Sequence, residues 1–207
     1  MEIEIGSISM EGRVLRNKNF QSTLPGLYVG CSFMSFSGAI CGGYLAARHA
    51  SEEIASAPVE FLALNEEELN EEKARVLRPM LDGGDTTYQL FESAIHQVMN
   101  YYMGYTRNEK GMKQALASLE RIEKLTDDLR AENLHELMRI HEGLDLLKLC
   151  RLVVMASMER RETSLCTMAI RGDYPDPDKN LADKILVIQK VNGSPKMHWE
   201  VKSEYLR

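Results

Sequence analysis

The feature that most constrains the fold is a run of helical periodicity from Thr86 to Met158. Apolar residues recur there at three- and four-residue spacing in three stretches, namely Phe91 to Tyr105, Met112 to Ile122, and Leu134 to about Arg161. This spacing places apolar side chains on one face of a helix. Because the connections between the stretches are short, they predict an antiparallel three-helix bundle. The third helix is apolar nearly all round after Leu144, so we expect its second half to be the most buried.

The flanking segments have a different character. Residues 1 to about 57 alternate short extended stretches with glycine-rich turns and then become helical from Gly38 to His49. Beyond the bundle, a proline-punctuated loop precedes two extended stretches joined by Asn192-Gly193, a preferred pair for a hairpin turn. The sequence therefore predicts an α+β chain with three parts: a strand-loop-helix fragment over residues 1–57, the helical domain over 58–162, and a loop with a C-terminal β-hairpin over 163–207.

Charge and composition exclude several classes of protein. The chain carries 31 acidic and 25 basic residues, for a net charge of -6. Nucleic-acid binding needs a clustered positive field, so it is not expected. The most apolar stretch, Leu144 to Met158, is interrupted by charges and is too short to span a membrane. The four cysteines form no CxxC pair, which argues against zinc and iron–sulfur sites and fits a reducing cytoplasm.

Two local patterns resemble catalytic or binding motifs but do not fit them. His135 and His141 are six residues apart, whereas a zinc pair on one helix face needs a spacing of four. Gly38 to Gly43 lacks the GxGxxG order of a dinucleotide-binding turn. The small residues at this helix start favour two interpretations equally: exposed backbone N–H groups that receive an anionic ligand, or close packing of the helix on its neighbour.

Two separated segments, taken together, resemble the flavoprotein family of fumarate reductase and succinate dehydrogenase, which includes the adenylylsulfate reductase alpha subunit. PGLYVGCSFMSFSGAICGGYLAARHA, from Pro25, is similar to the last flavin-contacting segment of that family, and ERRETSLCTMAIRGDYPDPD, from Glu159, to its C-terminal signature. MGYTRNEKGMKQAL, from Met103, resembles a motif of its helical domain. The eight residues between Glu162 and Arg171 resemble the adenylylsulfate reductase branch.

The resemblance implies FAD as the cofactor. It implies that Cys31 stands where the family places an acidic ribose ligand, and that the helix start faces the pyrimidine edge of the flavin. The cofactor-binding residues that it implies are Cys31, Ser37, Gly38, Ala39 and Ile40. No catalytic residue is assigned. Ser164 replaces the arginine of the signature, no arginine occurs between Phe33 and Gly43 to grip a dicarboxylate, and no GxGxxG occurs in the sequence.

These departures leave three interpretations open. The first is one half of a split FAD-dependent oxidoreductase, whose flavin site is shared with and completed by an FAD-binding flavoprotein chain; an iron–sulfur subunit is a further candidate partner. The second is a non-catalytic structural or docking subunit derived from the same family. The third is a truncated gene product.

Overall fold

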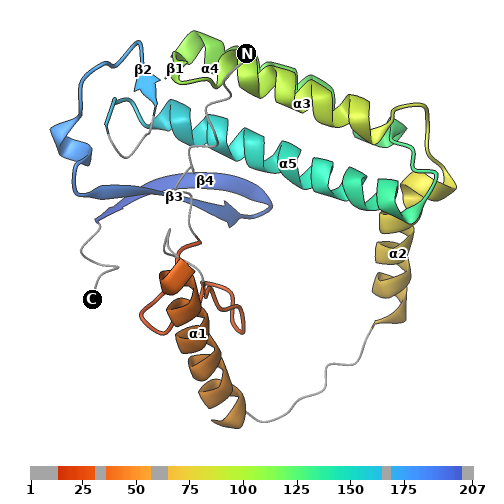
Figure 1. Ribbon diagram of the computed structural model, residues 1–207, viewed down its shortest axis with the longest axis horizontal. Helices are drawn as coiled ribbons and strands as arrows, with labels where there is room; N and C mark the ends of the chain where they lie inside the picture. Colours follow the sequence, from red (N-terminus) through yellow and green to blue (C-terminus); the bar gives the residue numbers. More distant parts are fainter. Residues whose placement is uncertain (1–13, 31–35, 57–64, 165–168, 202–207) are drawn as a thin grey trace. The chain divides into compact units, whose positions relative to one another are not determined.

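The computed structural model describes residues 14–30, 36–56, 65–164 and 169–201. The chain divides into two compact units. One consists mainly of the segment before residue 64 and the other mainly of residues 64–179, and the C-terminal hairpin contributes to both. Within the described residues, five α-helices and a two-stranded hairpin confirm the predicted α+β class (Figure 1).

The N-terminal unit is built around helix α1, Phe36–Ser56, which is longer at both ends than the predicted helix. Gly42 is buried on its inner face, and a Cβ atom there would lie 2.0 Å from the carbonyl oxygen of Gly30. Only glycine permits this approach of helix and loop. The expected strand near Val29 is reduced to an isolated antiparallel bridge between Gln21 and Tyr28, and the strands expected before residue 14 lie outside the described residues.

Helix α2, Glu66–Leu81, begins directly after Asn65. The side chain of Asn65 caps the helix by accepting a hydrogen bond from the backbone N–H of Glu67 at 3.1 Å. Three glutamates follow in the first turn, where the partial positive charge of the helix end favours them. No residue of this helix is buried, as expected for a solvated charged helix.

The predicted bundle is formed by α3 (Tyr88–Tyr102), α4 (Glu109–Glu123) and α5 (Leu134–Glu159), which pack on one another. Figure 1 shows α4 running opposite to α3 and α5. Phe91 on α3 packs against Gly143 on α5, where a Cβ atom would lie 3.0 Å from the Phe91 ring. The centre of the bundle is lined by fully buried apolar side chains, among them Phe91, Ile95, Met112, Leu119, Ile140 and Val154.

Helix α5 carries its buried residues on one stripe: Leu137, Ile140, Gly143, Leu147, Cys150 and Val154. No residue from Cys150 to Met158 is exposed, whereas seven residues between Leu134 and Leu149 are. The predicted burial of the second half therefore holds from Cys150 to Met158, whereas Asp145, Lys148 and Leu149 are exposed. No helix among the described residues is long and apolar enough to cross a membrane.

The C-terminal hairpin consists of β3 (Lys184–Val191) and β4 (Ser194–Val201). Asn192 and Gly193 connect the strands with φ values of 50° and 81°. Two successive positive φ values are the geometry of a type I′ turn, which matches the twist of antiparallel strands. The predicted hairpin and its turn are confirmed.

Candidate functional site

The residues predicted to face a flavin lie at one helix start. Ser37, Gly38, Ala39 and Ile40 follow Phe36 in the first turn of α1, with Ser37 and Ile40 exposed and Gly38 and Ala39 half-buried. Cys31 lies outside the described residues. The first turn of α1 holds no acidic residue, so no carboxylate of this turn offsets the partial positive charge of the helix end.

The two interpretations of this helix start, close packing and the binding of an anionic ligand, apply to different parts of α1. Close packing explains Gly42, which faces Gly30 across a gap too small for a side chain. The helix start itself lies one turn earlier, beside the exposed side chains of Phe36 and Ser37. An anionic edge such as that of a reduced flavin fits the partial positive charge of a helix N-terminus.

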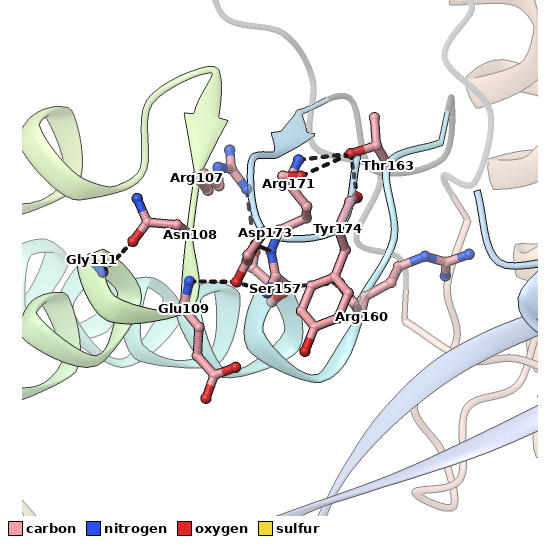
Figure 2. Close-up of polar contacts among 10 residues, drawn as sticks. All are labelled: Arg107, Asn108, Glu109, Gly111, Ser157, Arg160, Thr163, Arg171, Asp173 and Tyr174. Atoms are coloured by element: carbon pink, nitrogen blue, oxygen red, sulfur yellow. Dashed lines mark hydrogen bonds and ion pairs between the residues drawn. The ribbon is translucent and has the colours of Figure 1, made fainter. Parts of the chain in front are cut away.

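The C-terminal signature forms a second site, at the end of the bundle where α5 stops and α4 begins (Figure 2). Strand β1 (Thr106–Arg107) precedes α4, and strand β2 (Ile170–Arg171) follows the loop after α5. The two pair in parallel, with Thr106 opposite Ile170 and Arg107 opposite Arg171. This short pairing places the C-terminal signature next to the start of α4 in the bundle.

The guanidinium of Arg171 is the centre of this site. Its side chain is 2% exposed, and its Nη1 donates to the backbone carbonyl oxygens of Ser157 and Arg160 at the C-terminal end of α5. Its Nε and Nη2 donate to the two carboxylate oxygens of Asp173 at 2.9 and 3.0 Å. A cation at a helix C-terminus satisfies carbonyl groups that have no partner in the helix and opposes the negative end of the dipole.

Asp173 links this arginine to α4. One of its carboxylate oxygens accepts a hydrogen bond from the backbone N–H of Glu109, the first residue of α4, at 2.8 Å. The hydrogen bonds from Arg171 hold the pKa of the Asp173 carboxyl below its usual range, and the N–H of Glu109 adds to this effect. The ion pair therefore joins the C-terminal end of one helix to the N-terminal end of another, each with the charge that its dipole favours.

A second buried charge lies directly after α5. Glu162 is 2% exposed, and its Oε1 accepts from Nε of Arg160 at 2.6 Å. Its Oε2 accepts from the backbone N–H of Asp178 at 3.1 Å, which draws the proline-rich segment back toward α5. Ser164, at the position where the resemblance implies an arginine, donates its hydroxyl to Glu162 at 3.3 Å. Serine thus adds a neutral partner to this carboxylate.

Arg107 is a member of this site that the sequence reasoning missed. Its Nε donates to the carbonyl oxygen of Gly104 at 2.9 Å and its Nη1 to Oγ of Ser157 at 3.2 Å. Burial, followed by the neighbouring charge of Arg171, lowers the pKa of Arg107. The sequence signal that could have identified Arg107 is its place in GYTRNEKG, immediately before the helix cap Asn108. The side chain of Asn108 accepts a hydrogen bond from the backbone N–H of Gly111.

Arg107, Glu162, Arg171 and Asp173 with their partners form a polar corner at this end of the bundle, and its chemistry is structural. Arg171 is too deeply buried to touch a substrate, and its hydrogen bonds go to two helix ends. Within the described part of the chain, no buried side-chain polar atom lacks a hydrogen-bond partner. A network satisfied in this way fixes one arrangement of the loops and helices. The two sites belong to different compact units.

Comparison with known proteins identifies relatives of this chain. The model of a family described as the fumarate reductase flavoprotein C-terminal region matches residues 92–205. A curated relative, an FAD-dependent oxidoreductase of Methanocaldococcus jannaschii, is 25% identical over 150 residues, which are 72% of this chain and 27% of that protein.

Solved structures share the fold. Adenylylsulfate reductase from Archaeoglobus fulgidus has a TM-score of 0.69 at 21% identity, with 80% of this chain and 28% of that chain covered. Quinol fumarate reductase of E. coli has a TM-score of 0.73 at 17% identity, with coverage of 90% and 35%. The chain thus spans between about a quarter and a third of the length of these relatives.

Proposed function

The chain belongs to the fumarate reductase flavoprotein C-terminal family, and from this we propose that it supplies the C-terminal part of an FAD-dependent oxidoreductase whose flavin site is completed by a partner chain. The observation that supports this proposal best is the helix start of α1. Its residues Ser37 to Ile40 include no carboxylate and fit a negatively charged ligand edge.

The role of the helix start follows from electrostatics. When bound, FAD would supply the redox chemistry. Backbone N–H groups in the first turn of α1 would stabilise negative charge on the bound ligand edge, because they are already oriented and need no reorganisation during the reaction. The partner chain carries the dinucleotide-binding part, which the 207 residues do not include as a GxGxxG motif.

The polar corner has a supporting role in this proposal. Arg171 holds the segment that contains the C-terminal signature to the three-helix bundle. The helices of the bundle then provide a rigid body on which the oxidoreductase is assembled. An iron–sulfur subunit is a further candidate partner in such an assembly, and a reducing cytoplasm is the location that the lack of a CxxC pair in the sequence favours.

Co-expression with a chain that carries a GxGxxG flavin-binding segment tests the proposal. We expect the two chains to co-purify as a yellow complex with a flavin absorption band. Gly38→Val should lower its flavin content and its reductase activity, because the bulkier side chain crowds the helix start. Gly43→Val is the matched control, since Gly43 lies on the same helix with nothing within 4 Å of an added Cβ. A colourless complex, or equal flavin content in both variants, would contradict the proposal.

A second function, a non-catalytic docking subunit, is favoured by Ser164. The hydroxyl of Ser164 is engaged with Glu162 inside the polar corner, where the family signature has an arginine. The same complex separates the two functions. Reductase activity that survives Gly38→Val, while the complex stays intact, would favour the docking role.

A further inference from the structure

Helix α1 carries large apolar side chains on the face turned away from its loop. The loop contacts the side of Gly42, which faces the carbonyl oxygen of Gly30. On the same side, Glu53 accepts a hydrogen bond from the side chain of Gln21 at 3.0 Å. The other side carries an apolar stripe of four residues, which are 85, 57, 69 and 71% exposed in chain order: Phe36, Ile40, Tyr44 and Ile54.

The four residues of the apolar stripe share one face of the helix. Phe36, Ile40 and Tyr44 follow one another at four-residue spacing, and Ile54 lies about five full turns, or ~27 Å, beyond Phe36. Ala47, small and exposed, lies on the same face between Tyr44 and Ile54. Single apolar residues are common on protein surfaces, but a contiguous apolar face of this length is typical of a surface that another protein covers.

We propose that the apolar stripe is the docking surface for the partner chain that carries the rest of the flavin site. This inference rests on the proposed function, which supplies the partner. Phe36 begins the turn that holds Ser37 to Ile40, so a chain that completes a flavin site at this turn reaches the near end of the stripe. Tyr44 and Ile54 lie ~6 and ~21 Å beyond Ile40 along the axis. A ligand edge at the first turn leaves them uncovered, and an apolar surface of the partner chain covers them.

Other occupants fit the stripe less well. A second copy docked on the same stripe would cover Phe36 and Ile40 and so block the helix start that the ligand edge needs. A membrane surface favours lysine and arginine on the polar face of an interfacial helix, whereas α1 has one arginine, Arg48, which pairs with Glu52 at 2.9 Å. The chain spans 27% and 28% of two of its relatives, so the larger part of such a protein lies outside the matched region and can supply the covering surface.

Isothermal titration calorimetry of this chain with the GxGxxG chain of the co-expressed complex, with and without FAD, tests the proposal. We expect Tyr44→Lys and Ile54→Lys each to weaken the complex about 30-fold or more, the loss typical of a central interface residue. Gly43→Val, at the edge of the stripe, adds no charge and should bind as the parent chain does. Leu81→Lys on α2 is the matched control and should also bind normally. Leu81 is 76% exposed and Ile54 71%, and lysine suits the last turn of either helix.

The outcomes separate this inference from the proposed function. Equal affinity in Tyr44→Lys, Ile54→Lys and Leu81→Lys, within a complex that binds FAD, would overturn the docking surface and leave the shared flavin site standing. Weakening confined to the two stripe variants, in a complex that binds no FAD, would support the docking surface and contradict the flavin site. The absence of any complex would overturn both.

The lone chain tests the other occupants. A dimer in sedimentation velocity that is lost in Tyr44→Lys and Ile54→Lys would assign the stripe to a second copy. Binding to phosphatidylglycerol vesicles that is lost in the same variants would assign it to lipid. A lower free energy of unfolding in both variants than in Leu81→Lys would assign it to packing within this chain. Each of these results would overturn the proposal.

Discussion

Arg171 and Asp173 form a side-on ion pair that connects two helix ends of opposite polarity. Arg171 donates both to Asp173 and to the last carbonyl groups of α5, while Asp173 accepts from the first N–H of α4. Each charge opposes the helix dipole that it faces. The pair therefore holds the segment around Asp173 to both helix ends.

Removing the carboxylate of this pair should strongly destabilise the bundle. Asp173→Asn leaves Arg171 buried without a counter-charge, and breaking a buried pair typically costs about 3–5 kcal/mol. Urea denaturation followed by circular dichroism measures the free energy of unfolding. Lys113→Ala, which breaks an exposed pair with Glu109, is the control and should cost at most about 1 kcal/mol. Equal losses in the two variants would contradict the central role of Arg171.

The same pair should make stability depend on acid. The folded-state pKa of Asp173 is lowered by Arg171, so its contribution to stability is complete above the unfolded pKa of about 4 and is lost as the pH falls through the lowered folded value. Asp128, whose pKa is lowered by the Thr86 hydroxyl, acts in the same direction. Unfolding measured as a function of pH should show a weaker acid dependence in Asp173→Asn than in the parent chain. An unchanged acid dependence would rule out this assignment.

The close contact of α1 with its loop gives a matched pair of glycine variants. Gly42→Ala places a Cβ atom 2.0 Å from the Gly30 carbonyl oxygen and should detach the loop from α1. Gly43→Ala meets open space and should stabilise the helix by up to about 1 kcal/mol, because alanine restricts the unfolded chain. Limited proteolysis of residues 14–56 checks both. If the two variants were cut at the same rate, the packing described for Gly42 would be incorrect.

The hairpin turn should respond to the loss of glycine. Gly193→Ala forces an alanine to a φ of 81°, which is unfavourable for any residue with a Cβ atom, and should cost about 1 kcal/mol. Hydrogen exchange of the amides of β3 and β4 reports this loss. Faster exchange confined to the two strands is expected, and exchange that remains unchanged would argue against the type I′ turn.

The helices could be predicted from the sequence because their signals are local. Asn65 and Asn133 each cap the helix that follows them, and the capping hydrogen bonds span two or three residues. The end of α1 was placed too early, at His49. An ion pair between Arg48 and Glu52 continues the helix by another turn, and this spacing of four residues was available in the sequence.

The polar corner could not be derived in the same way. Arg171 reaches Ser157 across fourteen positions, and Asp173 reaches Glu109 across sixty-four. No local rule specifies such pairs, because they form only when β1 and β2 meet. The resemblance identified the signature residues, but their partners at the helix ends, and the participation of Arg107, required the fold.

Binding of FAD, measured by the quenching of its fluorescence, tests the central claim most directly. The chain is titrated alone, and then together with a chain that carries the GxGxxG flavin-binding segment. We expect no saturable binding to the chain alone and one FAD for each pair of chains in the mixture, with Gly38→Val weakening binding and Gly43→Val leaving it unchanged. Stoichiometric binding of FAD to this chain alone would contradict a flavin site shared between two chains. Binding of FAD to the partner chain alone, with the same affinity as to the mixture, would contradict it as well.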